Sequence, residues 1–369
     1  MRICIFTSVF LPDVGGAELA VDALARGYQN LGHDVVVLAQ GNPAKLDVPY
    51  DVAWVPKPVL PRWYPGRIGK RLIGLHNDRH IDVVHANYTM PVGYAAVKAS
   101  ETAGFPVVIG SQGGDLYHSS KHRKRQHMWS RTEYAVNHAH GLVAISPHMR
   151  ALMEEINPSP KCVADIPNGV HVKEFSEPAE RPSDYTDERP YCLCLGNLGP
   201  MKGFDHAIQA FAKVQDRMGD TIMLVVGDGS MREELEALAT KHGLMGDRVQ
   251  FLGQRTGEAK RWLMRHSRFG VMPSIEEGLP LVGAEFLASG KPLLGSTNPS
   301  FDELVDESNG CRVTPKHPQE LGELLVKMHE SDLDSMGEAS LRRAERFDWS
   351  RIAEEYVQFF ERVIAEQAK

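Results

Sequence analysis

Two carboxylates, Glu277 and Glu285, have seven residues between them in the stretch 273–292 and could both meet one small ligand. A carboxylate accepts hydrogen bonds from hydroxyl groups but is repelled by a phosphate. The same stretch contains a loop that leads into a helix, and the N-terminus of a helix attracts anions such as a diphosphate. A nucleotide sugar offers both partners, since its diphosphate suits the helix amides and its ribose and hexose hydroxyls suit the carboxylates. The alternative for this stretch alone is an ordinary helix with two solvated glutamates.

A strand, a loop and a helix must position these carboxylates. Residues 269–272 are apolar and predict a short strand. Pro280 suits a first helical position, because its fixed φ and missing N–H cost nothing there. Gly290 and Pro292 predict the end of that helix. The strand therefore directs the helix N-terminus toward whatever lies beyond its carboxyl end.

The chain opens with a strand–helix–strand unit. Residues 2–8 are an apolar, β-rich run, residues 17–30 carry apolar side chains at helical spacing, and residues 34–38 read as the next strand. Such a unit predicts a parallel sheet, in which ligands bind beyond the carboxyl ends of the strands. Gly15 and Gly16 stand at that place, and paired glycines let the backbone approach a phosphate or a sugar closely.

A similar half begins near residue 191. Residues 191–196 and 221–226 predict strands, the loop 197–203 follows the first of them, and residues 204–218 predict a helix. Gly227 opens a Gly-Asp-Gly sequence directly after the second strand, where glycines often indicate phosphate binding. Two such halves predict two Rossmann-like domains.

The sequence after Gly227 bears on two further expectations. Ser230 and Glu233 have the spacing of a capping box, which predicts the start of a helix at this point. A dinucleotide site also needs an acidic residue at the end of the following strand. That strand ends with residues 250–253, Gln-Phe-Leu-Gly, which include no acidic residue. Their composition argues against an NAD-dependent dehydrogenase.

Composition limits the class of protein. The chain has 369 residues, of which 42% are hydrophobic and 24% charged, as in a soluble globular protein with two domains. No apolar run approaches the length of a membrane span, and the N-terminus becomes polar too early for a signal peptide. Five cysteines without a Cys-x-x-Cys pair favour reduced thiols in the cytoplasm. The 16 histidines form no cluster with metal-ligand spacing, so we expect no metal.

Charge is unevenly distributed along the chain. Residues 1–172 carry 17 Lys and Arg against 14 Asp and Glu, a balance of +3, and the remainder carries −10, in agreement with the total of −7. The segment 121–131 is strongly basic, with Met128 and Trp129 interleaved. It is either a solvated helix face or a contact for an anionic membrane surface or acidic acceptor. We do not expect nucleic acid as a partner, because the basic segment is a single short patch in a protein whose net charge is negative.

Taken together, these motifs resemble retaining glycosyltransferases of family 4, which have the GT-B fold. The resemblance covers nearly the whole chain. It rests on the Gly-Gly-Ala-Glu opening at 15–18, the Ile-Pro-Asn-Gly-Val turn at 166–170, Gly-x(5)-Lys-Gly at 196–203, Gly-Asp-Gly at 227–229, and the Glu-x(7)-Glu pair.

The resemblance implies two Rossmann-like α/β domains with parallel sheets that face each other across a cleft. We expect an acceptor-side domain over 1–172, a linker rich in Pro, Ser, Asp and Glu over 173–190, and a donor-binding domain over 191–349. The last helix, 350–369, is amphipathic and is expected to pack back on the first domain.

The resemblance also implies roles for particular residues. Glu277 would contact the transferred sugar and, with Lys202, carry the catalysis, while Glu285 would hold the ribose. The donor-binding set is Gly15, Gly16, Asn197, Lys202, Gly227, Glu277, Gly278, Leu279, Pro280, Leu281 and Glu285. Gln112 and Asp115 would lie on the acceptor or sugar side.

Two positions depart from the family's usual pattern. Gln112 stands where many members have a histidine, although an amide can still hydrogen-bond a hydroxyl. Asn197 stands where an arginine is usual, so Lys202 would be the main cation for the diphosphate.

The expected activity is the transfer of a hexose from a UDP- or GDP-linked sugar to a saccharide or lipid-linked acceptor, in cell-surface polysaccharide or glycolipid synthesis. No cofactor is expected, and the enzyme would be cytoplasmic or peripheral on the inner face of the membrane. The alternatives are a nucleotide-sugar epimerase or hydrolase of the same fold, and a non-catalytic nucleotide-sugar-binding protein.

Overall fold

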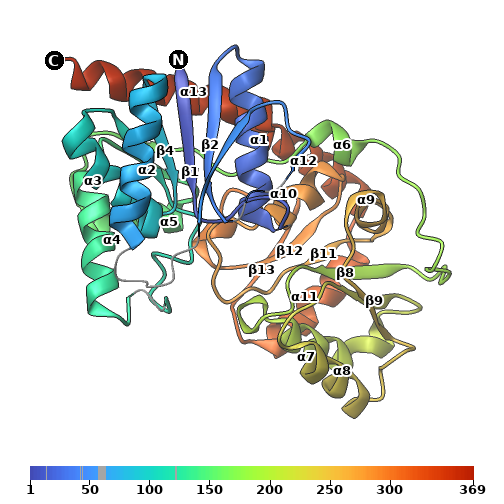
Figure 1. Cartoon of the computed structure of the whole chain (residues 1–369). Coiled ribbons are helices and arrows are strands. Elements are labelled where there is room, and N and C mark those ends of the chain that lie inside the picture. The colour runs from blue at the N-terminus through green and yellow to red at the C-terminus, as the bar shows by residue number, and fades with distance from the viewer. Residues whose placement is uncertain (14, 42, 44, 57–63, 121–122) are drawn as a thin grey trace. The chain divides into compact units, whose positions relative to one another are not determined.

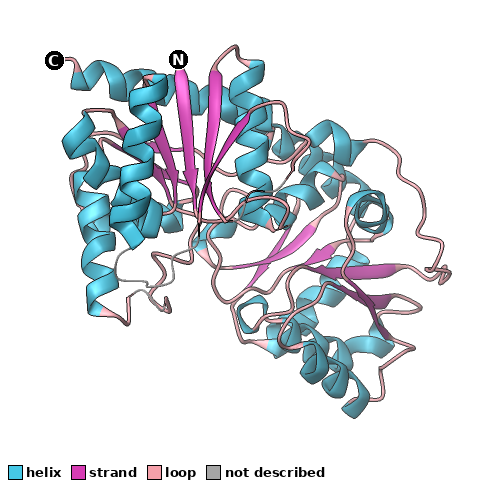
Figure 2. Cartoon of the chain, viewed as in Figure 1, coloured by secondary structure: helices cyan, strands magenta, loops and turns pink. Residues whose placement is uncertain are grey.

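The computed structural model describes residues 1–13, 15–41, 43, 45–56, 64–120 and 123–369. Contacts divide the chain into two compact units, each with its own sheet (Figure 1). The N-terminal unit consists of Met1–Gly169 with Trp349–Lys369, and the C-terminal unit consists of Val170–Asp348. Figure 2 shows the strands of each sheet running between helices.

The sheet of the N-terminal unit has, within the described residues, seven parallel strands in the order β3-β2-β1-β4-β5-β6-β7. They are β1 (Arg2–Thr7), β2 (Asp34–Gln40), β3 (Asp51–Val55), β4 (Val83–Asn87), β5 (Val107–Gly110), β6 (Gly141–Ala144) and β7 (Val163–Asp165). The central strands are mostly apolar and, except for Arg2 at the start of β1, buried, as expected where helices cover both faces of a parallel sheet.

The helices of this unit are α1 (Gly16–Asn30), α2 (Tyr64–Arg79), α3 (Tyr94–Ala103), α4 (Gln126–His138), α5 (Pro147–Ile156) and α13 (Trp349–Gln367). The predicted apolar stripe of α13 is buried, including Tyr356 and Phe360. A Cβ added at Gly27 of α1 would lie 2.6 Å from the Cβ of Ala353, so the glycine lets α1 and α13 approach closely. The last helix is thus part of the N-terminal unit.

The sheet of the C-terminal unit has six parallel strands within the described residues, in the order β10-β9-β8-β11-β12-β13. They are β8 (Tyr191–Leu195), β9 (Ile222–Val226), β10 (Val249–Gly253), β11 (Gly270–Val271), β12 (Leu293–Ser296) and β13 (Gly310–Val313). The helices are α6 (Val172–Ser176), α7 (Phe204–Val214), α8 (Arg232–Lys241), α9 (Gly257–His266), α10 (Leu281–Ala288), α11 (Pro318–Glu330) and α12 (Leu333–Ala344). The prediction of two Rossmann-like α/β domains is confirmed.

The segment 173–190 differs from the linker that its composition predicts. It lies inside the C-terminal unit and contributes most of α6, which packs against α10. Phe175 and Tyr185 are buried in this segment, with 8% and 4% of their surface exposed. Their burial explains the difference, because aromatic side chains anchor a chain whose composition is otherwise that of a linker.

Two helix starts also differ from the sequence prediction. The prediction of a capping box at Ser230 and Glu233 is wrong, because α8 begins at Arg232 with Met231 in the N-cap position and no side-chain cap. Helix α10 begins at Leu281, so Pro280 is its N-cap residue rather than its first helical residue. Pro280 has φ −75° and ψ 107°, an extended conformation.

Each sheet reverses its strand order once. The chain runs from β1 outward through β2 and β3 and then returns to β4 on the other side of β1. It runs likewise from β8 through β9 and β10 and returns to β11 on the other side of β8. Ligands of open α/β sheets bind beyond the carboxyl ends of the strands at such a reversal. The loops after β8 and β11, and those after β1 and β4, are therefore where ligand-binding residues are expected.

Candidate active site

The loops after β8 and β11 are joined to each other. The amide of Ile275 donates a hydrogen bond to the carbonyl of Met201 at 2.8 Å. Gly203, with φ 68°, passes so close to the other loop that an added Cβ would lie 2.4 Å from the carbonyl oxygen of Pro273. Only glycine accommodates both the positive φ and this approach. The two loops thus form one surface at the strand reversal.

A lysine and a glutamate meet on this surface. Lys202 Nζ lies 2.5 Å from Glu277 Oε1, and the two side chains are 24% and 12% exposed. Ser274, which is buried, donates its hydroxyl hydrogen to the same oxygen at 3.0 Å. Glu277 is therefore held in one orientation by a cation and a hydroxyl group.

The glycine loops after β8 and β9 pack against each other. A Cβ added at Gly227 would lie 1.8 Å from the carbonyl oxygen of Gly196, so any side chain here would force the loops apart. The amide of Leu198 donates to the carbonyl of Asp228 at 2.9 Å. Asn197 projects from the first of these loops and is exposed. The loops thus present backbone, rather than bulky side chains, beside Lys202.

The start of α10 lies directly after Glu277. Gly278, Leu279 and Pro280 are buried and lead into Leu281, the first helical residue. The first amides of a helix have no acceptor within it and carry partial positive charge. The predicted diphosphate-binding amides are therefore at a helix N-terminus.

Glu285 lies on α10 and pairs with a lysine of α9. Lys260 Nζ lies 2.6 Å from each carboxylate oxygen of Glu285. The two side chains are 18% and 13% exposed. Two lysine–glutamate pairs thus involve the segment around the start of α10, since Glu277 precedes the helix and Glu285 lies on it.

Gly15 and Gly16 follow β1 in the N-terminal unit, where Gly15 is the N-cap residue of α1. The carboxylate of Glu18 folds over Gly15, with Oε2 2.5 Å from the position that a Cβ of Gly15 would take. Tyr88 follows β4, and burial, together with Asp115 and Glu18, raises the pKa of its phenol. The negative charge of Glu18 favours hydroxyl groups over phosphate at this position.

Gln112 belongs to a chain of three amide side chains in the N-terminal unit. Asn168 Nδ2 donates to Gln112 Oε1 at 2.8 Å, and Gln112 Nε2 donates to Asn87 Oδ1 at 2.8 Å. Asn87 and Asn168 are 1% and 4% exposed. Asn87 is the last residue of β4, and Gln112 and Asn168 follow β5 and β7, so the carboxyl edge of the sheet brings them together.

Asp115 is buried and bonded within its own unit. Its Oδ2 accepts from the amide and the hydroxyl of Thr89, both at 2.6 Å, and its Oδ1 accepts from Ser111 Oγ at 2.5 Å. Both carboxylate oxygens are thus used to join the loops after β4 and β5. This geometry makes Asp115 a residue that holds the loops after β4 and β5 in place.

The basic segment lies at the start of α4. Lys121 and His122 are outside the described residues. Arg123 pairs with Glu155 at 2.9 Å and stacks on Trp129 at 4.6 Å, whereas Lys124 and Arg125 are exposed. No helix of the described part of the chain has the length and apolar character needed to cross a membrane. The described residues contain no cluster of metal-ligating side chains.

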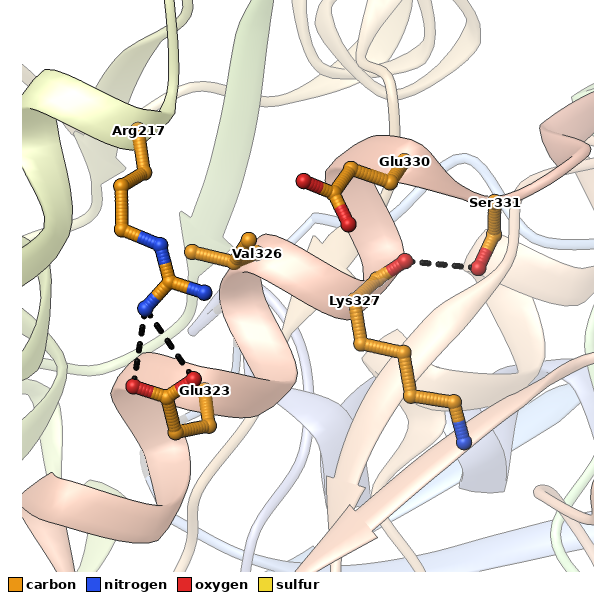
Figure 3. A pocket seen from close by; sticks show the side chains of 6 residues that line it. All are labelled: Arg217, Glu323, Val326, Lys327, Glu330 and Ser331. Carbon is orange, nitrogen blue, oxygen red and sulfur yellow. Dashed lines mark hydrogen bonds and ion pairs between the residues drawn. The ribbon is translucent and has the colours of Figure 1, made fainter.

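A separate hollow in the C-terminal unit lies away from these loops. It is lined by residues of the segment before β9 and of the second half of α11, with Arg217 paired to Glu323 at 2.9 and 3.0 Å (Figure 3). Arg217 precedes the amino end of β9, and the other lining residues belong to α11 or directly follow it, whereas the glycine and glutamate loops follow the carboxyl ends of strands. The hollow is therefore not part of the candidate active site.

Solved structures share this architecture. The sucrose-phosphate synthase of Thermosynechococcus elongatus superposes with a TM-score of 0.82 at 19% identity and covers 99% of this chain and 100% of its own. HepE of Anabaena, solved with UDP and glucose, superposes with a TM-score of 0.80 at 21% identity and covers 97% of this chain and 98% of its own. The fold is that of the GT-B glycosyltransferases.

Sequence comparison identifies the family. The family model for Glycosyltransferase Family 4 matches residues 14–174, and the model for Glycosyl transferases group 1 matches residues 176–343. A GDP-mannose-dependent monoacylated alpha-(1-6)-phosphatidylinositol monomannoside mannosyltransferase of Corynebacterium glutamicum is 26% identical over 290 residues, which are 74% of each chain. This chain belongs to the family 4 glycosyltransferases and is a glycosyltransferase.

Sequence analysis missed four residues that shape this site. Ser274 stands three positions before Glu277. A hydroxyl residue so close in the sequence to a candidate site carboxylate is a signal from which the contact could have been predicted. Lys260 and Asn87 carry no local signal, because each contacts a residue that is distant in the sequence. Asn168 stands in the turn at 166–170, but the turn does not indicate its contact with Gln112.

Proposed function

We propose that the chain is a retaining glycosyltransferase that moves a hexose from a UDP- or GDP-linked sugar to a hydroxyl group of a saccharide or lipid-linked acceptor. The observation that carries the proposal is the pair of lysine–glutamate contacts beside the N-terminus of α10. They combine carboxylates for hydroxyl groups with cations and amides for a diphosphate. Further support comes from the GDP-mannose-dependent relative and from the solved structure that holds UDP and glucose.

In the proposed reaction, the bond between C1 of the sugar and the diphosphate oxygen breaks. A bond from C1 to the acceptor oxygen forms on the same face, and the acceptor proton passes to the leaving diphosphate. Lys202 and the amides of Leu279 and Leu281 stabilise the charge that grows on the diphosphate. Glu277 binds a hydroxyl of the transferred sugar, and Glu285 binds the ribose. We propose no metal or cofactor, because these groups supply the positive charge.

The N-terminal unit is proposed to meet the acceptor, which fits a role in cell-surface polysaccharide or glycolipid synthesis. Gln112, held by two amide partners, suits a hydroxyl group of the acceptor or of the sugar, whereas Gly15 and Gly16 are proposed to contact the donor. Asp115 acts indirectly by fixing the loops around Gln112.

A ligand screen followed by product analysis tests the function. Thermal shift with UDP-, GDP- and ADP-sugars and NAD should show stabilisation by a nucleotide sugar and none by NAD. Release of the nucleoside diphosphate should then depend on a sugar acceptor. Release without an acceptor would instead show a hydrolase, an altered donor would show an epimerase, and binding without turnover would show a scaffold.

Substitution of Glu285 tests the ribose contact. Glu285→Gln should weaken binding of the bare nucleoside diphosphate about tenfold, because a hydrogen bond to a charged acceptor is replaced by one to a neutral acceptor. Isothermal titration with UDP and GDP measures this change. Glu323→Gln, which alters an exposed ion pair far from the site, serves as the control (Figure 3). Unchanged affinity in Glu285→Gln would exclude the ribose role.

The basic segment is proposed to contact anionic membranes. Binding of the protein to vesicles that contain phosphatidylglycerol should be weak and should fade as salt rises, since exposed charges are screened. Lys124→Glu with Arg125→Glu should abolish the binding. Lys213→Glu with Lys241→Glu, the same charge change at exposed positions of the C-terminal unit, should not. Equal sedimentation with neutral and anionic vesicles would contradict the proposal.

A further inference from the structure

Lys260 contacts both carboxylate oxygens of Glu285, a half-buried glutamate on α10. Its Nζ is equally distant, 2.6 Å, from the two oxygens of Glu285. Lys260 donates a hydrogen bond to Oε1, while Oε2 is buried and has no hydrogen-bond partner among the described residues. A carboxylate offers about four acceptor positions, so positions stay open on both oxygens. The arrangement fixes the plane of the carboxylate as well as its charge.

The helix that carries Lys260 is itself fixed. Arg261 Nη1 donates to the carbonyl of Glu174 at 3.0 Å, and Arg265 Nη1 donates to the carbonyl of Ser176 at 2.5 Å. The Nζ of Lys260 also lies 5.6 Å from the ring centroid of the buried Phe175. Three side chains on two turns of α9 thus contact α6, so that the ammonium group approaches Glu285 from a defined direction.

We propose that Lys260 is a positioning residue that orients Glu285 toward two neighbouring hydroxyl groups, and that this pair makes the site selective for ribonucleotides over deoxyribonucleotides. The inference rests on the proposed role of Glu285 at the ribose. The acceptor positions that stay open on the two oxygens of Glu285 match the two hydroxyls of a ribose. A deoxyribose has one of these hydroxyls fewer, so an acceptor on the half-buried carboxylate would stay unpaired.

Paired titrations test this selectivity. The unmodified protein is first titrated with UDP and GDP to find which of the two it binds. That nucleotide is then compared with its 2′-deoxy form, 2′-deoxy-UDP or 2′-deoxy-GDP. The ribonucleotide should bind about 10- to 100-fold more tightly, the range expected for one hydrogen bond to a charged group. Lys260→Met should reduce this ratio to near one, and Lys260→Arg should preserve it. Lys213→Met, a lysine that bonds Gln319 elsewhere in the unit, is the matched control.

The outcomes separate this inference from the proposed function. If Glu285→Gln keeps the full ratio, the ribose role of Glu285 fails. If Glu285→Gln loses the ratio and Lys260→Met keeps it, the role of Lys260 fails. When Lys260 acts through Glu285, the Lys260→Met/Glu285→Gln double variant should match the Glu285→Gln single variant. The ratio of ribonucleotide to deoxyribonucleotide affinity, measured on one protein sample, is insensitive to the fraction of unfolded protein. Lys260→Gln, which retains a hydrogen-bond donor, provides a second variant if Lys260→Met folds poorly.

Discussion

Replacement of Lys202 by alanine is expected to lower the rate of sugar transfer by about 10²–10³-fold, the loss typical when one preorganised group that stabilises a transition-state charge is removed. Lys202 is the cation that the structure places at the reversal point beside the α10 N-terminus, where it contacts Glu277 at 2.5 Å. Its neighbour Asn197 can donate hydrogen bonds but cannot balance charge. The rate of nucleoside diphosphate release, measured with the donor sugar that the screen identifies and an acceptor, checks the prediction.

Circular dichroism should show an unchanged fold for Lys202→Ala, and Lys213→Ala should keep normal turnover. Asn197→Arg should keep or raise activity, because Asn197 is exposed and the substitution restores the usual pair of cations. Near-normal turnover of Lys202→Ala would contradict the assignment. The alternative cation would then be Arg255, which must first leave Asp184, its partner at 2.7 Å.

Glu277→Gln should have the second large effect, a fall of about 10²-fold in kcat with little change in donor affinity. Glu277 is proposed to bind the reacting sugar, and such contacts matter most when they strengthen in the transition state. The amide keeps the shape of the side chain and can still accept from Ser274, so binding should be retained. Steady-state kinetics that separate kcat from the donor KM measure the effect.

A double variant provides the sharper test of this carboxylate. Lys202 and Glu277 are in direct contact, so the losses from Lys202→Ala and Glu277→Gln should combine to less than their product. Ser274→Ala, which removes only the hydroxyl that orients Glu277, should give a smaller loss in kcat. If Glu277→Gln raises the donor KM and leaves kcat unchanged, Glu277 contributes to binding alone.

The sequence by itself determined which segments become strands, loops and helices around the site. The apolar runs of β1 and β8, the glycines after them and the stretch from Glu277 to Glu285 indicate a parallel sheet with ligand-binding loops. These patterns are local, because backbone dihedral preferences and hydrophobic spacing act over a few residues. The carboxyl ends of parallel strands share one edge, so the sequence also predicts that Lys202 and Glu277 lie on the same side of one sheet.

Only the tertiary structure decided which side chains become partners. Lys202 and Glu277 are 75 positions apart, and they meet because β8 and β11 are neighbours, which strand order alone determines. Lys260 reaches Glu285 from a separate helix. Asp115 has the sequence context of a site residue, yet burial commits both of its oxygens to Thr89 and Ser111. A carboxylate buried in a low-dielectric interior must be hydrogen-bonded, and which donors surround it is a property of packing rather than of local sequence.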